Sequence, residues 1–481
     1  MSRYRILPAL WILLFGLVLR IIPAVNQYFW FDETFSLYAS THYQFPFYDY
    51  FDAPLHFVIV KLWSLVSYNS FWLRTSSIIF SLLSLWVYYK ILHTFLSKRI
   101  AIIGLLLMTI SPYHIHYAWQ MRNYSLSLLI ITISLYLYIT IIQHIRKGGI
   151  VASKLFLLYF SVNFIGFLVH YVYGVFSFLL FFSLVTELVL SKNTHTWRSS
   201  PFRLFVLGHA LYLLVYVILH PAAFNASAYA ALAWIPIISA QSLYTQFYQL
   251  TNIFPNNVAV ILLLYGCYLI RKRYAYLFRL LVIVIVGTFS IGFIFQLITS
   301  MSFITEKTVG FIYILLQIPI ALVISTYALR TKQNILIVLC ISLCCVYLLQ
   351  SIIQGNRMNN YQPTYITSGY VQAVSYLKQQ KVKTQNVLIL PLYFTPTAWY
   401  YWGQYETNTD TAFPLNITYS KYLNQIGNGD TTPENFPLPA YVLKKNNFYI
   451  SNPESQLYVR LMHRCNSEFI NDDAEILRCQ Q

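Results

Sequence analysis

Long apolar runs, separated by short clusters of basic residues, restrict this sequence more than any other feature. The clusters recur along the first 352 residues as Arg3/Arg5, Lys98/Arg99, Arg146/Lys147, Lys192/Arg198/Arg203, Arg271/Lys272/Arg273 and Arg330/Lys332. Only 10% of the residues are charged and 58% are hydrophobic, whereas soluble domains carry about 25% charged residues. Because one water-exposed globule cannot bury so many apolar groups, the sequence predicts a polytopic α-helical membrane protein.

The apolar runs between the basic clusters give about eleven candidate membrane spans. They are residues 7–25, 74–96, 100–112, 125–144, 154–169, 172–190, 203–220, 256–270, 278–299, 308–328 and 333–352. Lys and Arg gather in cytoplasmic loops close to the helix ends, and each basic cluster recurs after two crossings. The sequence therefore predicts a multi-pass protein of the bacterial inner (plasma) membrane, with a cytoplasmic N-terminus and an extracytoplasmic C-terminus.

The net charge of +17, from 32 Lys and Arg against 15 Asp and Glu, would also suit a nucleic-acid binder. Such a protein needs one contiguous basic face, usually with aromatic residues beside it. Here the bases are divided among separate loops. The charge therefore reports membrane topology, and no nucleic-acid partner is predicted.

The composition becomes polar after residue 352, which predicts a small extracytoplasmic α/β domain over 353–481 behind a membrane domain over 1–352. A helix is expected from Thr367 or Ser368 to Lys383, because apolar residues recur there at three-residue spacing. A buried strand over 387–390, an aromatic segment over 399–402 and a second strand near 448–451 follow.

The cysteines divide in the same way. Cys465 and Cys479 lie in the polar domain, where an oxidising compartment permits a disulfide between them. The others are predicted to be small core residues, because no His or Cys partner lies at metal-binding spacing. These are Cys267, Cys340, Cys344 and Cys345.

The first extracytoplasmic loop, residues 26–73, is the predicted active-site loop. Asp32 and Glu33 are adjacent there, among aromatic residues. Desolvation and mutual repulsion raise the proton affinity of one carboxylate in such a pair, which suits a general base. Asp52, His56 and Lys61 follow in the same loop. The alternative is that the acids are a solvated surface pair.

A second extracytoplasmic segment, residues 111–124, carries Arg122 as its only Lys or Arg. A guanidinium can hold a phosphate through two hydrogen bonds. His116, Gln120 and Tyr124 are predicted to share one helical face. The alternative is an interfacial aromatic belt in which the arginine reaches lipid headgroups.

Three further cations are placed at helix ends facing outward. Arg20 lies near the end of the first apolar helix. Insertion of a charge there costs about 2.5–3.5 kcal/mol, so Arg20 is expected to have a polar partner. Asp32 and Glu33 are the nearest candidates in the sequence. Lys61 and Lys307, the latter beside Glu306, are either interface anchors or substrate contacts.

The order and spacing of several short motifs resemble the PMT-type branch of the GT-C glycosyltransferases, which includes protein O-mannosyltransferases and the aminoarabinose transferases of lipid A. The motifs are Leu19-Arg20, Trp30-x-Asp32-Glu33, Asp52-x-Pro54-Leu55, Ser111-Pro112 and Arg122-x-Tyr124. The similarity covers residues 1–130 best. The chain departs from the family pattern at Ala53, at Asn123, where an apolar residue is common, and at Glu306-Lys307-Thr308, where the family usually has Arg-Tyr.

The resemblance implies an inverting hexosyl or pentosyl transferase of the cell envelope that uses a polyprenyl-phosphate-linked sugar at the extracytoplasmic surface. It implies that Asp32 is the base, that Glu33 is its neighbour or positions the acceptor, and that Asp52 is a second loop carboxylate. The implied substrate and phosphate contacts are Arg122, Tyr124, Lys61, His56, Arg20 and Lys307.

Cofactors and acceptors are less constrained by the residues. No obligate metal is expected, although sequence does not distinguish base catalysis from a divalent ion held by Asp32, Glu33 and Asp52. The acceptor is expected to be lipid A, a glycan or a protein. The alternatives are a lipid-linked sugar transporter (flippase), a polysaccharide polymerase or ligase, and a non-enzymatic scaffold.

Overall fold

A computed structural model describes most of the chain, and it divides the chain into two compact units. The described residues are 7–42, 54–148, 151–170, 172–191, 202–203, 206–211, 237–251, 256–300, 302–305, 307–327, 368–390, 395–403, 439, 441–445, 465–470 and 474–479. The first unit comprises residues 1–25, 44–59 and 74–352, and the second comprises residues 26–43, 60–73 and 353–481.

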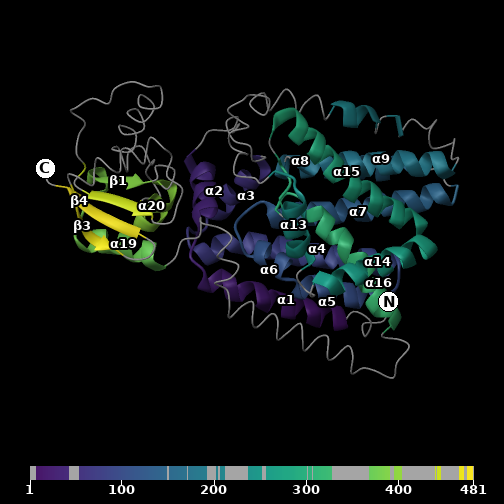
Figure 1. Ribbon diagram of the computed structural model, residues 1–481, viewed down its shortest axis with the longest axis horizontal. Helices are drawn as coiled ribbons and strands as arrows, with labels where there is room; N and C mark the ends of the chain where they lie inside the picture. The colour runs from purple at the N-terminus through teal and green to yellow at the C-terminus, as the bar shows by residue number, and fades with distance from the viewer. Residues whose placement is uncertain are drawn as a thin grey trace. The chain divides into compact units, whose positions relative to one another are not determined.

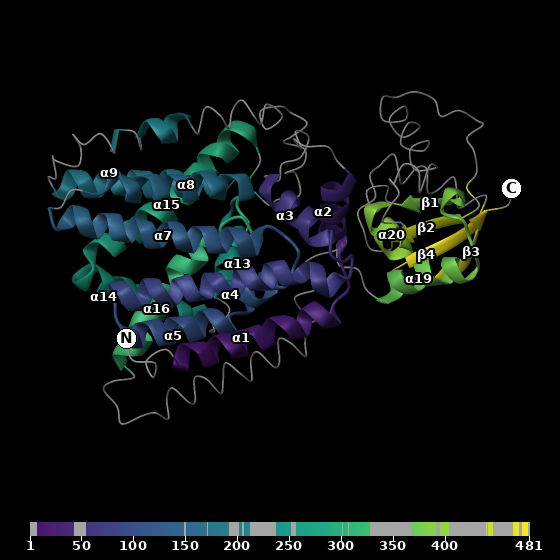
Figure 2. The same cartoon turned by 180° about the vertical axis from the view of Figure 1, so that it is seen from behind.

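The first unit is a helical bundle (Figure 1). Its helices are α1 (Leu7–Asn26), most of α3 (Pro54–Ser64), α4 (Ser70–Phe95), α5 (Lys98–Ile110), α6 (Pro112–Ala118), α7 (Tyr124–Arg146), α8 (Ser153–Val169), α9 (Tyr173–Ser191), α13 (Ala240–Thr251), α14 (Asn256–Arg273), α15 (Ala275–Thr299) and α16 (Gly310–Tyr327). Helices α7, α8 and α9 lie side by side, and α9 packs against α15 (Figure 2). Helix α16 packs against α5 and α14.

Apolar composition makes this bundle a membrane domain. Within the described residues, five helices are long and apolar enough to cross a membrane, and a sixth crossing is formed if the bent pair of α5 and α6 counts as one. Helices α8 and α16 are shorter apolar helices. Each predicted span that falls in the described residues coincides with a helix, whereas 333–352 and most of 203–220 lie outside them. The chain is therefore a multi-pass membrane protein.

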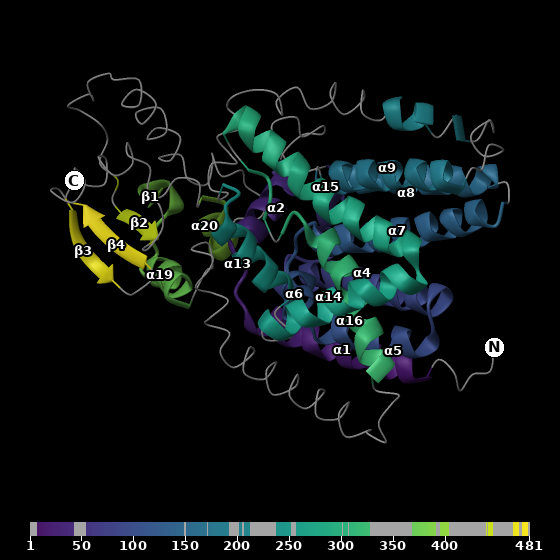
Figure 3. The same ribbon diagram turned by 45° about the vertical axis from the view of Figure 1, so that its right-hand side comes forward.

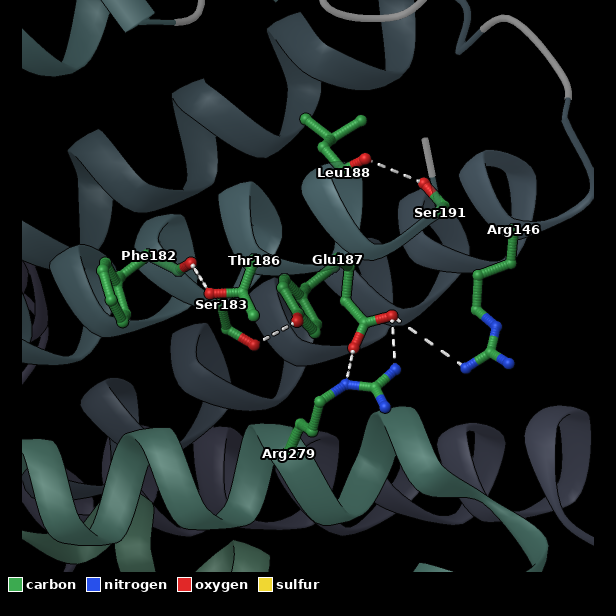
Figure 4. A network of polar contacts seen from close by, with 9 residues as sticks. Arg146, Phe182, Ser183, Thr186, Glu187, Leu188, Ser191 and Arg279 are labelled. Carbon is green, nitrogen blue, oxygen red and sulfur yellow. Dashed lines mark hydrogen bonds and ion pairs between the residues drawn. The ribbon is translucent and has the colours of Figure 1, made fainter. Parts of the chain in front are cut away.

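Close backbone approach and one ion-pair network hold the bundle together. A Cβ atom at Gly266 of α14 would lie 2.5 Å from the Pro319 carbonyl oxygen of α16, so the two helices pack there without a side chain between them. Glu187 of α9 is buried and accepts two hydrogen bonds from Arg279 of α15, at 2.5 and 2.9 Å (Figure 4). The Arg146 guanidinium of α7 lies 3.9 Å from the same carboxylate. This carboxylate therefore joins three helices.

The second unit contains a four-stranded sheet in the order β1-β2-β4-β3 (Figure 3). Its strands are β1 (Val387–Leu390), β2 (Tyr441–Lys445), β3 (Cys465–Ile470) and β4 (Ala474–Cys479). Strands β1 and β2 are parallel, and the other two pairs are antiparallel. Val387 to Leu390 is fully buried, as its continuous apolar run predicted. A disulfide joins Cys465 and Cys479, which face each other in the β3–β4 register.

Helices cover this sheet. Helix α19 (Ser368–Gln379) packs against β2 and β4 and leads through the 3-10 turn η3 (Thr384–Asn386) into β1, while α20 (Thr395–Trp402) packs against β1 and α19. The helix expected to end at Lys383 ends at Gln379, and Lys381 adopts a positive φ just after it. The strand predicted near 448–451 lies outside the described residues.

The second unit also takes up part of the predicted active-site loop. Helix α2 (Phe31–His42) belongs to it, together with residues 60–73. Helix α2 packs directly on α20. The carboxylates Asp32 and Glu33 are therefore carried by the same compact unit as the C-terminal sheet.

Candidate functional site

A helix break within the membrane unit creates the first element of the site. Helices α5 and α6 form a pair bent by 61°. Ser111 stands at the break as C-cap of α5 and N-cap of α6, and its hydroxyl accepts a hydrogen bond from the His114 backbone N–H at 3.5 Å. Pro112 follows at the first helical position, where its missing N–H costs nothing. The break places the polar residues of α6 inside the bundle.

Arg20 of α1 occupies a buried polar cluster beside this break. Its side chain is fully buried, and it donates hydrogen bonds to Ser81 Oγ at 2.7 Å and to the Gly16 and Thr109 carbonyl oxygens at 2.7 and 3.5 Å. A further nitrogen lies 2.8 Å from His114 Nδ1. Arg20 thus has the polar partners expected of a cation in an apolar helix. The carboxylate partner suggested for it stays a prediction.

The tautomer of His114 follows from that contact. A guanidinium has no acceptor, so His114 Nδ1 must accept from Arg20 and the ring proton must be on Nε2. That nitrogen lies 3.2 Å from Ser84 Oγ, which therefore accepts from it. His114 is a neutral, oriented ring in this arrangement.

The turn between α6 and α7 presents Arg122 and Tyr124. The Arg122 guanidinium lies 5.9 Å from the centre of the Tyr124 ring. Asn123 between them is buried, and its side-chain amide donates to the Val169 carbonyl at 3.1 Å, which ties the turn to the end of α8. The departure from the family pattern at Asn123 therefore has a structural role. The predicted shared helical face is wrong, because α6 ends at Ala118 and Tyr124 begins a new helix, but the His116 and Gln120 side-chain nitrogens lie 3.1 Å apart.

Lys307 is presented by a second tight turn, ahead of α16. Thr308 Oγ1 donates to the Phe303 carbonyl oxygen at 2.7 Å and accepts from the Thr305 N–H at 2.9 Å. The Thr308 N–H in turn donates to Thr305 Oγ1 at 3.2 Å. These reciprocal bonds fix the backbone on both sides of the half-buried Lys307. Its neighbour Glu306 lies outside the described residues.

Tyr124, which follows the first turn, and Lys307 of the second turn both line a cavity of about 20 Å³. Its lining residues are Tyr113, Tyr124, Ser127, Leu128, Ile131, His170, Tyr173, Lys307, Thr308, Gly310 and Phe311. None of these described residues is acidic. A space of this size holds about one water molecule or one atom of similar radius. The cavity therefore combines one ammonium group with hydroxyl and imidazole groups, an arrangement suited to an anionic oxygen.

Glycine at position 310 makes room for this site. A Cβ atom there would lie 2.6 Å from the Tyr113 hydroxyl oxygen, closer than van der Waals contact allows. Tyr113 also packs against Tyr313 of α16, with ring centres 4.6 Å apart. The small residue therefore lets the start of α16 approach α6 closely.

Several of these groups were not singled out by sequence reasoning. The cavity is lined by Tyr113, His170 and Tyr173, among others. In the sequence each is a single aromatic or His residue in an apolar segment, and nothing marks it as part of a site. Arg74 of α4 is fully buried, donates to the Ala24 carbonyl oxygen at 3.0 Å, and lies 4.8 Å from the Trp119 ring centre. A cation inside an apolar helix was the available signal for Arg74, as it was for Arg20.

The adjacent acids of the second unit have different surroundings. Glu33 is fully buried, and its Oε2 accepts a hydrogen bond from the Trp30 backbone N–H at 3.3 Å, as a glutamate does in a capping box. The Trp30 carbonyl oxygen accepts from the Glu33 and Thr34 N–H groups, which begins α2. Asp32 is half-buried in the same first turn. Glu33 thus stabilises the helix start, and Asp32 is the more accessible carboxylate.

The remaining predicted residues are distributed between the units. His56 is buried in the part of α3 that belongs to the membrane unit, with its ring 5.7 Å from that of Phe57. Lys61, later in α3, is exposed and belongs to the second unit. Asp52 lies outside the described residues. No group of three His, Cys, Asp or Glu side chains is gathered within the described part of the chain, and because Asp52 is not among them the metal-free mechanism stays a prediction.

Comparison of the whole fold with solved structures gives long matches to membrane glycosyltransferases. ArnT from Cupriavidus metallidurans matches in its apo state, with a TM-score of 0.60 and 11% identity over 98% of this chain and 97% of that one. The same protein bound to undecaprenyl phosphate matches with a TM-score of 0.59, 10% identity and the same coverage. The archaeal oligosaccharyltransferase AglB from Archaeoglobus fulgidus, in complex with an inhibitory peptide and a dolichol-phosphate, matches with a TM-score of 0.53 and 11% identity over 92% of this chain and 69% of that one.

Comparisons of the sequence itself do not identify a family or a relative. No protein-family model and no curated protein sequence matches the chain. At this level of identity the structural matches establish architecture and not activity. The resemblance drawn from the short motifs is confirmed at the level of the fold, and the chain is a multi-pass membrane protein with the GT-C fold of the ArnT and AglB glycosyltransferases.

Proposed function

We propose that this protein is an inverting glycosyltransferase of the bacterial inner membrane that moves a sugar from a polyprenyl-phosphate-linked donor to an acceptor hydroxyl at the extracytoplasmic face. The observation that carries this proposal is the Lys307 cavity, in which the described lining is cationic and hydroxyl-rich without an acid. It lies in a fold shared with ArnT, which has been seen with undecaprenyl phosphate, and with AglB, seen with a dolichol-phosphate.

The proposed donor contacts follow from charge and size. The cavity, of about 20 Å³, has room for one phosphate oxygen. Lys307 neutralises that oxygen, and the Tyr113 and Tyr124 hydroxyls and His170 donate hydrogen bonds to it, whereas the Tyr173 hydroxyl donates to Asn163. Arg122, whose guanidinium lies 5.9 Å from the centre of the Tyr124 ring, supplies a second cation from the neighbouring turn. Charge-assisted hydrogen bonds of this kind are the strongest that a protein offers a phosphate.

The proposed reaction is a single displacement. Asp32 accepts the proton of the acceptor hydroxyl as its oxygen forms a bond to the anomeric carbon. The bond from that carbon to the phosphate oxygen breaks at the same time, with inversion, and the polyprenyl phosphate leaves with one more negative charge. Lys307 and Arg122 stabilise this developing charge, which is the step where fixed cations lower a barrier most. Neither an obligate metal nor another cofactor is part of the proposal.

The transferred group is proposed to be a hexose or pentose, and the acceptor lipid A, a glycan or a protein. Mass spectrometry of these three fractions from a strain that lacks the protein identifies the acceptor by the sugar that is missing. A lipid-linked sugar transporter would change none of the covalent linkages when it is assayed alone with donor and acceptor.

The test of the base is transfer by purified protein supplied with a polyprenyl-phosphate sugar donor. Asp32→Asn should lower the transfer rate by about 10²–10⁴-fold, the range for general acid–base catalysis. Asp49→Asn, which alters another acid of the same sequence segment, is the matched control and should stay near wild type. Wild-type rates for Asp32→Asn would refute the assignment of the base.

A further inference from the structure

The aromatic segment of α20 contacts the chain just before the carboxylate helix α2. The Tyr401 hydroxyl donates a hydrogen bond to the Phe29 carbonyl oxygen at 2.7 Å. The ring of Tyr400 lies 4.9 Å from that of Phe29, which is buried. Phe29 is three residues before Asp32. The entry into α2 is therefore held from the C-terminal domain.

A buried hydroxyl pair fixes the middle of the interface. Thr34 Oγ1 and Thr397 Oγ1 are 2.9 Å apart, and both side chains are fully buried. Thr34 already gives its single hydroxyl proton to the Phe31 carbonyl oxygen at 2.8 Å. Thr397 must therefore be the donor between the two threonines. This directional contact sets the register of α2 against α20.

Trp399 closes the far end of the interface. Its indole meets the rings of Tyr38 and His42 edge-on, each with centres 5.3 Å apart, and no part of it is exposed. Thr34, Tyr38 and His42 recur every four residues and so lie on one face of α2. These three residues all contact α20.

The length of α2 makes these contacts decisive for its position. A helix of 12 residues is marginal in water without packing partners. Asp32 lies in its first turn, between the Phe29 and Thr34 contacts. Any displacement of α2 moves the Asp32 carboxylate with it, and a misplacement of about 1 Å can cost about 10²-fold in rate.

We infer that α20 is a positioning element for the reaction: Thr397, Trp399 and Tyr401 hold α2 so that the C-terminal domain sets the place of the Asp32 carboxylate. The catalytic meaning of this inference rests on the proposed function, whereas the docking of α2 on α20 does not. The C-terminal domain then takes part in catalysis indirectly: it holds α2, a helix that comes from the N-terminal part of the chain.

Cross-linking in the purified full chain tests the docking. The hydroxyl separation of 2.9 Å puts positions 34 and 397 within reach of a disulfide, so the pair Thr34→Cys/Thr397→Cys should cross-link under mild oxidation. The pair Thr41→Cys/Thr397→Cys is the control, because position 41 lies about 10 Å further along α2 and should not cross-link. Locked protein should keep at least half of the wild-type transfer rate. Absence of the cross-link, or a lock that stops transfer until reductant is added, would overturn the inference.

Substitution of Trp399 tests the positioning role. Trp399→Ala should lower kcat about 10–100-fold with the KM for the donor unchanged, and it should shift the acidic limb of the pH–rate profile because the surroundings of the base change. Trp399→Phe should restore most of kcat, and so should the Thr34→Cys/Thr397→Cys disulfide in the Trp399→Ala background. Unchanged kcat in Trp399→Ala, or failure of the lock to restore it, would contradict the inference.

Two controls separate this result from simpler explanations. Phe469→Ala removes an aromatic ring that stacks on Tyr376, 5.4 Å away in the same domain, and should leave kcat unchanged. Wild-type protein taken through the same oxidation and reduction accounts for the Cys465–Cys479 disulfide. A wild-type protein that transfers no sugar would count against the proposed function alone, because the cross-linking yield is measured without substrate.

Discussion

At the scale of single residues, the two adjacent acids differ in what surrounds them. Glu33 is buried and caps the start of α2 through the Trp30 N–H, whereas Asp32 is half-buried in the same turn. A carboxylate committed to a cap is held away from substrate, and an accessible one is not. The two acids look equivalent in the sequence, but Glu33 is a structural group and Asp32 is the candidate base.

Substitution of Glu33 should reveal this division. Glu33→Gln keeps an oxygen for the Trp30 N–H and, since glutamine also serves in capping boxes, should retain at least a tenth of the wild-type rate. Glu33→Ala removes the cap and should cost about 0.5–2 kcal/mol of stability. Thermal unfolding and transfer rates of the two variants check this. A Glu33→Gln protein as inactive as Asp32→Asn would show that Glu33 itself takes part in the chemistry.

Lys307 is the residue expected to control donor affinity. Charge-assisted hydrogen bonds contribute about 1.5–3 kcal/mol, so Lys307→Gln should weaken binding of polyprenyl phosphate about 10–150-fold. Titration of the lipid phosphate measures the effect directly. Lys90→Gln is the matched control, since Lys90 lies over the Trp86 ring and away from the cavity lining. Equal affinities of the Lys307 variant and wild type would remove this cavity from the phosphate site.

At the scale of elements, short turns place the polar groups of the membrane unit. The α5–α6 break at Ser111, the Asn123 turn and the Thr305–Thr308 turn each satisfy backbone groups with a side-chain hydrogen bond. Inside a membrane an unsatisfied backbone group costs several kcal/mol, so such turns occur only where side chains or cavities replace the helical bonds. The same elements therefore provide both the local stability and the cavity.

The ion-pair network of Glu187 joins helices α7, α9 and α15. Its two arginines should contribute unequally to the stability of the bundle. Arg279 binds both carboxylate oxygens of the buried Glu187, and breaking such a pair costs about 3–5 kcal/mol. Arg146 lies 3.9 Å away with 43% of its side chain exposed, a geometry that contributes about 0–1 kcal/mol. Arg279→Gln should therefore lower the unfolding temperature in detergent far more than Arg146→Gln does. Equal shifts would mean that the carboxylate is shared evenly.

At the scale of the whole molecule, the positive-inside pattern predicts which ends of the helices face the cytoplasm. Single cysteines introduced at Lys98 and Lys147, in a background without the free native cysteines, should react with an impermeant thiol reagent only after the membrane is permeabilised. A cysteine at the exposed Lys378 of α19 should react in intact cells once the outer membrane is made permeable. The opposite pattern would invert the topology and place the carboxylate helix in the cytoplasm.

The sequence alone determined the membrane architecture, because a long apolar run inserts into lipid and a basic cluster stays on the cytoplasmic side whatever the rest of the chain does. It also determined the start of the sheet at Val387–Leu390, a continuous apolar run. Strands β3 and β4 escaped prediction. Strand β3 is mostly exposed, and the charged Glu475 and Arg478 interrupt the short, mostly buried apolar run of β4. Their pairing comes from neighbouring strands and the Cys465–Cys479 bond. Only the tertiary structure could decide that α2 packs on α20 and that Lys307 shares a cavity with Tyr113 and His170. These groups are far apart in the chain, and contact between distant residues is decided by packing, which no local pattern encodes.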